Sequence, residues 1–315
     1  MNIVLASRPA GRMNVEGPIK VESLGGFLRV DGKQFRDALY VYSFNGDCIV
    51  VNHVDLEKYV IGLLHSEMNA NWNTETLKAQ AVAARSYAVF QMKVAGNTKF
   101  RNFKPPFDLD SSVKDQVYEG AHKERYKAMR AVEATKGQVL QTFAGEPVKA
   151  FYHSTCGGHT ECPERVWGAK YAYMKPVPCG YCNSSPRFNW NYEVAESVLV
   201  EKLAKAKALL GKFVSLKLVK RNPAGRAEKI EVRGSEGAKV LTTAKLREII
   251  GTSNLMSTDF ILAAGTAGKM IFAGHGSGHG VGMCQWGAKV MGEKNFTYAQ
   301  ILKRYYPQTQ ISKIY

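Results

Sequence analysis

Most of the cysteines and histidines of this 315-residue chain lie in two stretches. The first reads FYHSTCGGHTECPERVWG, followed by PVPCGYC, and offers six soft metal ligands. A structural zinc ion takes four such ligands in a tetrahedron, and Cys179-x-x-Cys182 has zinc-knuckle spacing. We predict a structural zinc site made of Cys156, Cys179, Cys182 and His159, with His153 as the alternative fourth ligand. Disulfides between these cysteines are the rival in an oxidising compartment.

The second stretch, GHGSGHGVGMCQWGA at residues 274–288, sets His275 and His279 among alternating glycines. Glycine at this density disfavours helices and strands, so the two histidines are not expected to share a helical face as a metal pair. The stretch also lacks the lysine of a phosphate-binding loop. We therefore predict a tight loop.

A third stretch, SEMNANWNTETLKAQAVAARSYAVF, contains two charged residues that could act together. Arg85 falls on the apolar side of an alanine-rich helix, where an unpaired guanidinium is costly. Either its head reaches water, or it pairs with an acid. The nearest acid in the sequence is Glu67, beside Met68 and Trp72. An apolar wall raises a carboxyl pKa and keeps the group protonated, as a general acid requires, although a glutamate in a loop is also often simply solvated.

The elements that must position these residues follow from periodicity. Residues 18–53 read as antiparallel strands with turns at Asp31-Gly32 and Asn45-Gly46. Residues 55–93 read as a helical pair broken at 69–73. Further hairpins are expected at 137–153 and 213–232, and further helices at 243–250 and 297–306.

The predicted fold class is therefore α+β: antiparallel β-hairpins packed with a pair of helices in the N-terminal half and a C-terminal helix, around a central cleft. We divide the chain into an N-terminal β region at residues 1–50 and a catalytic domain at residues 51–315, which could be continuous with those strands.

Composition limits the partners. A hydrophobic content of 45% supports a substantial core, and a net charge of +16 favours polyanions. A nucleic-acid binder should carry basic residues with interleaved aromatics along one helix, and no such stripe is present. No apolar run is long enough to span a membrane, and residues 1–13 lack the apolar stretch of a signal peptide.

Four motifs together resemble the stage II sporulation protein D (SpoIID) family. SEMNANWNTETLKAQAVAARSYAVF is similar to its signature. FDLDSSVKDQVYEG, FYHSTCGGHTE with VWG, and HGVGMCQWGAKVMGEKNFTYAQILKRYYP resemble three later blocks in the same order. The resemblance implies a peptidoglycan lytic transglycosylase, which cleaves between N-acetylmuramic acid and N-acetylglucosamine without water and leaves a 1,6-anhydro end. The sporulation members prefer strands stripped of peptides.

Carried over by position, the resemblance makes Glu67 the catalytic acid/base and Arg85 the motif arginine. Neutral Glu67 would protonate the glycosidic oxygen, and the resulting carboxylate would deprotonate the C6 hydroxyl that attacks C1. No cofactor is needed for this chemistry. The chain departs from the family at Asn69, where proline is common, and in DSSVKDQ, where many relatives carry cysteine or histidine.

The expected partner is the peptidoglycan glycan strand, with the glycine-rich loop as the wall of a cleft facing Glu67. A loop packed against the alanine-rich helix, with its histidines satisfied internally, is the alternative. The residues expected to bind the strand are His153, Ser154, His275, His279, Gln285, Trp286 and Trp72.

The alternative function is a non-catalytic wall-binding protein that enhances an amidase, which would make cell-wall amidases partners and Glu67 incidental. Because peptidoglycan lies outside the cytoplasmic membrane, we expect an extracytoplasmic location, in the periplasm or cell-wall space, with the signal peptide already removed.

Overall fold

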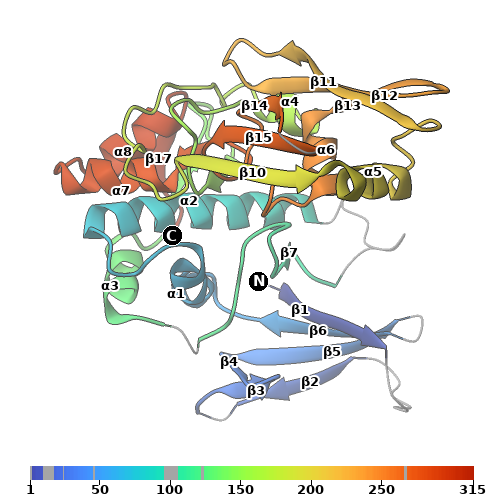
Figure 1. Ribbon diagram of the computed structural model, residues 1–315. Helices are drawn as coiled ribbons and strands as arrows, with labels where there is room; N and C mark the ends of the chain where they lie inside the picture. Colours follow the sequence, from blue (N-terminus) through green and yellow to red (C-terminus); the bar gives the residue numbers. More distant parts are fainter. Residues whose placement is uncertain are drawn as a thin grey trace. The chain divides into compact units, whose positions relative to one another are not determined.

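The structure is a computed structural model that describes residues 2–9, 18–23, 25–44, 47–95, 106–121, 124–265 and 268–315. It contains two compact units, each with helices and small sheets (Figure 1). The first comprises Met1–Phe151, Gly292–Lys303 and Gln308–Tyr315, and the second Tyr152–Met291 and Arg304–Pro307. The α+β class is confirmed. The predicted boundary at residue 50 stays a prediction; it falls within strand β6 (Asp47–His53), and β6 and the following helix α1 (Leu56–Glu67) belong to the same unit.

The first unit contains a five-stranded sheet of order β2-β5-β6-β1-β7. Its strands are β1 (Asn2–Pro9), β2 (Ile19–Glu22), β5 (Ala38–Phe44), β6 (Asp47–His53) and β7 (Leu109–Asp110). The hairpin of β3 (Leu28–Val30) and β4 (Lys33–Phe35) turns at Asp31 and Gly32, whose φ angles of 50° and 76° fit the predicted turn. The Asn45-Gly46 turn lies outside the described residues.

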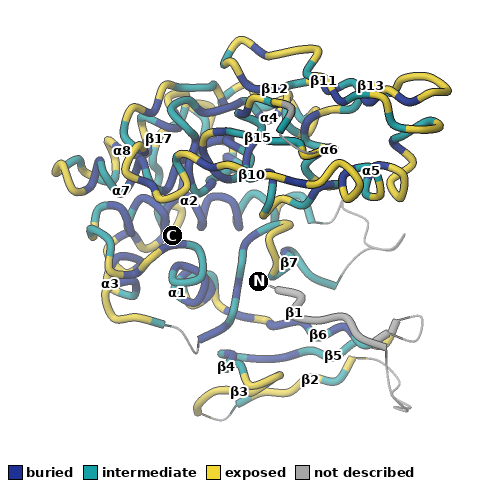
Figure 2. Tube along the Cα trace, viewed as in Figure 1, coloured by how far each residue is buried: buried dark blue, intermediate teal, exposed yellow. Residues whose placement is uncertain are grey.

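The predicted helical pair is α1 (Leu56–Glu67) and α2 (Thr74–Val94). The side chains of Asp55 and Asn73 cap the two N-termini by accepting backbone N–H bonds. Residues Thr76–Ala88 of α2 are buried except Lys78, so most of this helix runs through the core (Figure 2). Also in this unit are α3 (Tyr126–Ala134) and most of α8 (Tyr298–Tyr305).

The hairpin predicted at 137–153 is confirmed only at its turn. There the Thr142 and Val148 N–H groups donate to the Glu146 and Leu140 carbonyls at 2.9 and 3.3 Å, but no second strand follows beside the first. β8 (Gln138–Gln141) pairs with the C-terminal strand β17 (Gln310–Lys313), and β9 (Tyr152–His153) pairs in parallel with β16 (Met283–Cys284). A single bridge from Gln141 to Pro147 closes the turn between them. Proline has no N–H with which to extend the ladder.

The second unit contains two three-stranded antiparallel sheets (Figure 1). One has the order β11-β12-β13 and includes the predicted hairpin at 213–232; the other has the order β10-β15-β14. The strands are β10 (Asn189–Ala195), β11 (Phe213–Arg221), β12 (Ala227–Gly234), β13 (Gly237–Thr242), β14 (Phe260–Ala264) and β15 (Lys269–His275).

The helices of the second unit are α4 (Pro163–Trp167), α5 (Glu196–Lys205), the predicted α6 (Thr243–Ile250) and most of α7 (Gln285–Glu293). Leu199 of α5, Leu246 of α6 and Phe272 of β15 are fully buried in one core with both sheets. Among the described residues, no helix is apolar enough over a sufficient length to cross a membrane.

Candidate functional sites

Glu67 is the last residue of α1, and Met68 leaves the helix in an extended conformation. The Glu67 side chain is half-buried, and its Oε1 accepts the backbone N–H of Val117 at 2.6 Å. Val117 belongs to FDLDSSVKDQVYEG, so the first and second sequence motifs meet at this carboxyl group. Met68, 5% exposed, supplies the expected apolar neighbour, and Trp72 is half-buried in the turn that follows.

The loop that carries Val117 is fixed by buried side chains. Gln116 donates from Nε2 to the Ala84 carbonyl at 3.3 Å and accepts the Tyr59 hydroxyl at 3.0 Å. Asp115 accepts the Tyr87 hydroxyl at 2.8 Å. Because the loop is tied to both helices, the Val117 N–H is a preset donor for Glu67.

Arg85 is fully buried, so its head does not reach water but pairs with an acid; that acid is Glu57 and not Glu67. Its Nε and Nη2 donate to the two Glu57 carboxylate oxygens at 2.9 and 2.6 Å, and Nη1 donates to the Gln138 carbonyl at 2.9 Å. Ten residues of helix, about 15 Å, separate Glu57 from Glu67 along α1. The expected pairing of Arg85 with Glu67 is therefore corrected.

Glu57 is strongly hydrogen-bonded as an anion. Burial alone would raise its pKa, but donation from Arg85, the Tyr315 hydroxyl and the Gly137 N–H holds the pKa below its ordinary value. The geometry makes Arg85 and Glu57 a buried pair that joins α1, α2 and the start of β8.

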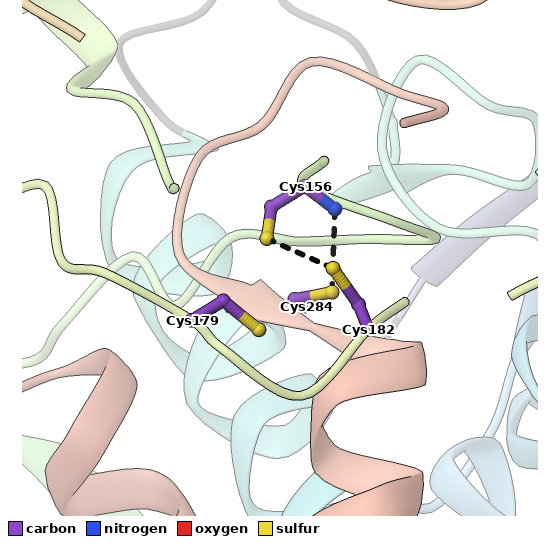
Figure 3. Close-up of side chains that lie close together, drawn as sticks. All are labelled: Cys156, Cys179, Cys182 and Cys284. Atoms are coloured by element: carbon purple, nitrogen blue, oxygen red, sulfur yellow. Dashed lines mark hydrogen bonds between the residues drawn. The ribbon is translucent and has the colours of Figure 1, made fainter. Parts of the chain in front are cut away.

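The cysteine cluster of the second unit has a different membership from the predicted one. Cys156, Cys179, Cys182 and Cys284 are buried, and their sulfur atoms all lie within 4.8 Å of one another (Figure 3). His159 is not among them: its Nδ1 lies 2.8 Å from the Thr160 carbonyl. His153, the alternative, is not among them either, and donates from Nδ1 to the Val281 carbonyl at 3.0 Å.

Cys284 reaches the cluster through the pairing of β9 with β16. Met283 and Cys284 lie opposite Tyr152 and His153 in a parallel ladder, which joins the third and fourth sequence motifs. The Cys156 N–H donates to the Cys284 sulfur at 3.3 Å. Sequence spacing suggested the other three cysteines because they lie within 27 residues of one another, whereas Cys284 is 102 residues beyond Cys182.

All six cysteines lie in described segments and are free thiols. Within the cluster, hydrogen bonds from Cys156 and Cys182 hold the pKa of Cys179 below its ordinary value, whereas burial raises the pKa of Cys284 well above it. Deprotonating all four buried sulfurs therefore requires a compensating cation.

Polar hydrogens already face the cluster. The N–H groups of Gly158 and Gly287 donate to the sulfurs of Cys156 and Cys284 at 3.4 and 3.3 Å, and the Tyr305 hydroxyl lies 3.2 Å from the Cys179 sulfur. Such donors stabilise thiolate charge and orient metal ligands.

The glycine-rich run packs against its own unit. A Cβ at Gly276 would lie 2.6 Å from the Thr155 carbonyl oxygen, and one at Gly278 would lie 3.0 Å from the His153 Cβ. Both glycines have positive φ angles. The missing side chains therefore admit the HSTC segment at these two positions, in place of the predicted sugar strand.

His153 and His279 form an aromatic group with Trp167. The His279 ring centroid lies 5.5 Å from that of His153 and 4.9 Å from that of Trp167, which is 48% exposed. Burial lowers the pKa of His153 to about 4 and also lowers that of His279, to which the neighbouring His153 contributes. Both rings are therefore neutral at pH 7.

The other predicted binding residues lie in three separate places. Gln285 and Trp286 begin α7, and the Trp286 N–H donates to the Ser154 carbonyl at 3.1 Å, which keeps these residues beside His153. His275 instead ends β15, with its Nδ1 3.9 Å from Asp259 Oδ2. Trp72 belongs to the first unit with Glu67.

Comparisons with known proteins agree with the motifs. The family model described as stage II sporulation protein matches residues 44–141. The chain is 31% identical to the stage II sporulation protein D of Bacillus subtilis, over 84% of this chain and 76% of that protein. It belongs to the stage II sporulation protein D family. An uncharacterized protein of Brachyspira hyodysenteriae is 32% identical, over 96% of this chain and 80% of that protein.

Two further matches are partial: one covers only part of this chain, and the other covers only part of the matched protein. A domain of unknown function matches residues 180–282, which include β10 to β15. The amidase enhancer of Bacillus subtilis is 29% identical over 80% of this chain, but the match covers only 40% of that longer protein. The shared part of the two proteins thus excludes most of the enhancer.

Proposed function

We propose that this protein is a peptidoglycan lytic transglycosylase in which Glu67 is the catalytic acid and base. The observation that carries the proposal is the junction at Glu67, where a half-buried carboxyl group at a helix end is oriented by the Val117 N–H from a second motif. One such group suffices when the C6 hydroxyl of the muramic acid acts as the nucleophile. Glu67 donates its proton to the leaving oxygen and then accepts the hydroxyl proton.

A hydrolytic route would need a second carboxylate to activate water or attack the sugar. Glu119 is the nearest candidate in the same loop. Its carboxylate accepts the Ser66 hydroxyl at 3.2 Å and pairs with Lys33 at 3.3 Å. These contacts favour a role in holding the loop, so we assign no chemical step to Glu119.

The test is mass spectrometry of products from peptide-free and peptide-bearing glycan strands. Wild-type protein should release anhydro-ended fragments, and Glu67→Gln should not. Glu146→Gln, which alters an exposed ion pair with Lys93, is the matched control and should keep activity. Equal product from Glu67→Gln and wild type would refute the enzymatic role. Reducing ends in place of anhydro ends, lost in Glu119→Gln, would favour hydrolysis.

We also propose that Cys156, Cys179, Cys182 and Cys284 hold one structural zinc ion. Sulfurs about 2.3 Å from a tetrahedral zinc lie about 3.8 Å from each other, and the cluster fits this size. Zinc would supply the positive charge that four buried thiolates require. The ion has no part in the proposed acid–base steps, which lie with Glu67 in the other unit.

Metal analysis of the purified protein tests the zinc proposal. We expect about one zinc per chain, lost in Cys284→Ser and retained in His159→Ala. Cys162→Ser, which changes a cysteine outside the cluster, is the control. Less than half an equivalent of metal, together with thiol counts that show paired cysteines, would replace zinc with disulfides.

The similarity to an amidase enhancer favours a second candidate, a non-catalytic wall-binding protein that acts through an amidase. On this reading the charge of +16 attracts anionic wall polymer. Stimulation of a purified cell-wall amidase by wild type and Glu67→Gln alike, without anhydro products, would favour it. Either function requires an extracytoplasmic location, which immunogold labelling of cell sections would test.

A further inference from the structure

The second unit contains a pocket that the sites above do not use. Its volume is about 330 Å³, and it lies at one end of the β10-β15-β14 sheet. Arg221, the last residue of β11, and Gly225, from the turn between β11 and β12, also line it. The pocket belongs to residues 180–282, the segment whose family description assigns no function.

The strand register lines up two rows of side chains across the pocket. Asn189 lies opposite His275, and the His275 N–H donates to the carbonyl of Asp259 at 2.8 Å. Two residues along, Asn191 and Ile261 flank Ala273 of the central strand. Cross-strand neighbours and residues two apart share a face, so both rows are on the same face of the sheet. Each row spans about 10 Å over three strands.

The floor of this pocket is low because the central strand presents a small residue, Ala273, to this face of the sheet. Ala273 stands between Asn191 and Ile261, which is 59% exposed. Gly274 faces the opposite, buried side of the sheet, where a Cβ would lie 2.4 Å from the Trp190 ring. Trp190 also lines the pocket, and its buried Nε1–H has no hydrogen-bond partner in the described part of the chain.

The lining chemistry suits a neutral polar ligand. Asn189 and Asn191 each offer donors and an acceptor, Asp259 accepts, and His275 can do either. The Arg221 guanidinium donates to the carbonyls of Gly225 and Phe260 at 2.6 and 2.9 Å. The opposite charges of Arg221 and Asp259 disfavour a strongly anionic ligand such as a phosphate.

Carbohydrates combine alternating hydroxyl donors and acceptors with an apolar C–H face. Ile261 and Ala273 provide an apolar surface between the polar side chains, as ligand pockets do generally. The 10 Å rows match two linked pyranose rings better than one, and an acetamido methyl would fit over Ala273. We propose that this pocket is a binding subsite for N-acetylated saccharide units of a glycan strand.

The proposal rests on the proposed function for its choice of glycan, but its test does not depend on catalysis. Tri-N-acetylchitotriose is titrated into the full-length Glu67→Gln protein by calorimetry. Asn191→Ala and Asp259→Ala should each raise the Kd about tenfold, because each removes a hydrogen bond to the ligand. Glu193→Gln, on the same face of β10 but outside the pocket, should leave the Kd unchanged.

Melting curves accompany each variant, and Asn191 is exposed, so folding is not at risk there. No binding by the Glu67→Gln parent protein at millimolar ligand, or a Kd in both pocket variants that is unchanged from the parent's, would overturn the subsite. Equal affinity for cellotriose, which lacks acetamido groups, would overturn the N-acetyl assignment. If the protein binds the saccharide but wild type releases no anhydro products, the transglycosylase proposal is refuted and the subsite proposal still stands.

Discussion

Replacing Arg85 should unfold the protein more readily without disabling the chemistry of the molecules that stay folded. The guanidinium is fully buried and donates twice to Glu57 and once to the Gln138 carbonyl. Arg85→Met would leave a largely buried carboxylate without its cation. Breaking such a pair costs about 3–5 kcal/mol, a large part of the stability of one domain.

A double-mutant cycle separates this structural role from a catalytic one. Glu57→Leu combined with Arg85→Met should cost about 1–3 kcal/mol less than the sum of the single changes, because no charge remains uncompensated. Urea denaturation at pH 7 measures these terms. Arg85→Lys should also destabilise, since a lysine cannot reproduce the two-pronged contact.

The stability that the Glu57–Arg85 pair contributes should decrease at low pH. The pKa of Glu57 is lower in the folded than in the unfolded protein. Its contribution to the free energy of unfolding is therefore full above the unfolded pKa of about 4.3 and is lost as pH falls through the folded value.

One result would refute the structural role of Arg85. If Arg85→Met were as stable as wild type but released no anhydro product per folded molecule, Arg85 would belong to the catalytic machinery.

Three other predictions concern single side chains. Glu67→Gln should lower the rate of anhydro-product release at least about a hundredfold while changing the urea-derived stability by about 1 kcal/mol at most, since one hydrogen bond is weakened; a larger stability loss would indicate a structural role. His153 has a folded pKa of about 4, so its contribution to stability should fall by about 3 kcal/mol as pH drops from 6.5 to 4, and His153→Gln should flatten that slope; identical slopes would contradict the burial of a neutral ring. Gly276 and Gly168 have similar φ angles of 78° and 76°, but an added Cβ would lie close to a carbonyl oxygen only at Gly276, where that of Thr155 is 2.6 Å away. Calorimetric melting should show about 1 kcal/mol lost at Gly168 and at least about 2 kcal/mol more at Gly276.

The sequence predicted the secondary-structure elements better than it predicted which side chains pair with each other. Periodicity identified α1, α2, α6 and the β11–β12 hairpin, because each buries one face or alternates within a local stretch. The same periodicity correctly placed Arg85 on a buried face. It could not choose between acids on α1, because that choice depends on how two helices pack.

A usable signal for Glu57 was nevertheless present. Arg85 lies eleven residues after the start of α2, and Glu57 lies ten residues before the end of α1. If two consecutive helices joined by a short turn run antiparallel, residues equally far from the turn lie opposite each other. Counting from the turn would have favoured Glu57 over Glu67, which adjoins the turn itself.

Cys284 carried no comparable signal, because its position depends on a two-residue parallel pairing between β9 and β16. The segments around the cluster contain little regular structure: between residues 152 and 188 the strand β9 and the helix α4 are the named elements. The proposed zinc ion would tie these segments together where the short elements bury little surface of their own.

If a metal ion fixes these segments, its removal should loosen them before the sheets of the same unit. Chelation at neutral pH should first increase hydrogen exchange at residues 152–162 and 276–287, which contain His153 and His279, while β11 to β13 stay protected by their own ladder. Cys284→Ser should reproduce that pattern, and Cys162→Ser should not. Uniform loss of protection across the unit would mean that the cluster stabilises the whole core. The placement of the histidine pair would then be no more dependent on the cysteines than the sheets are.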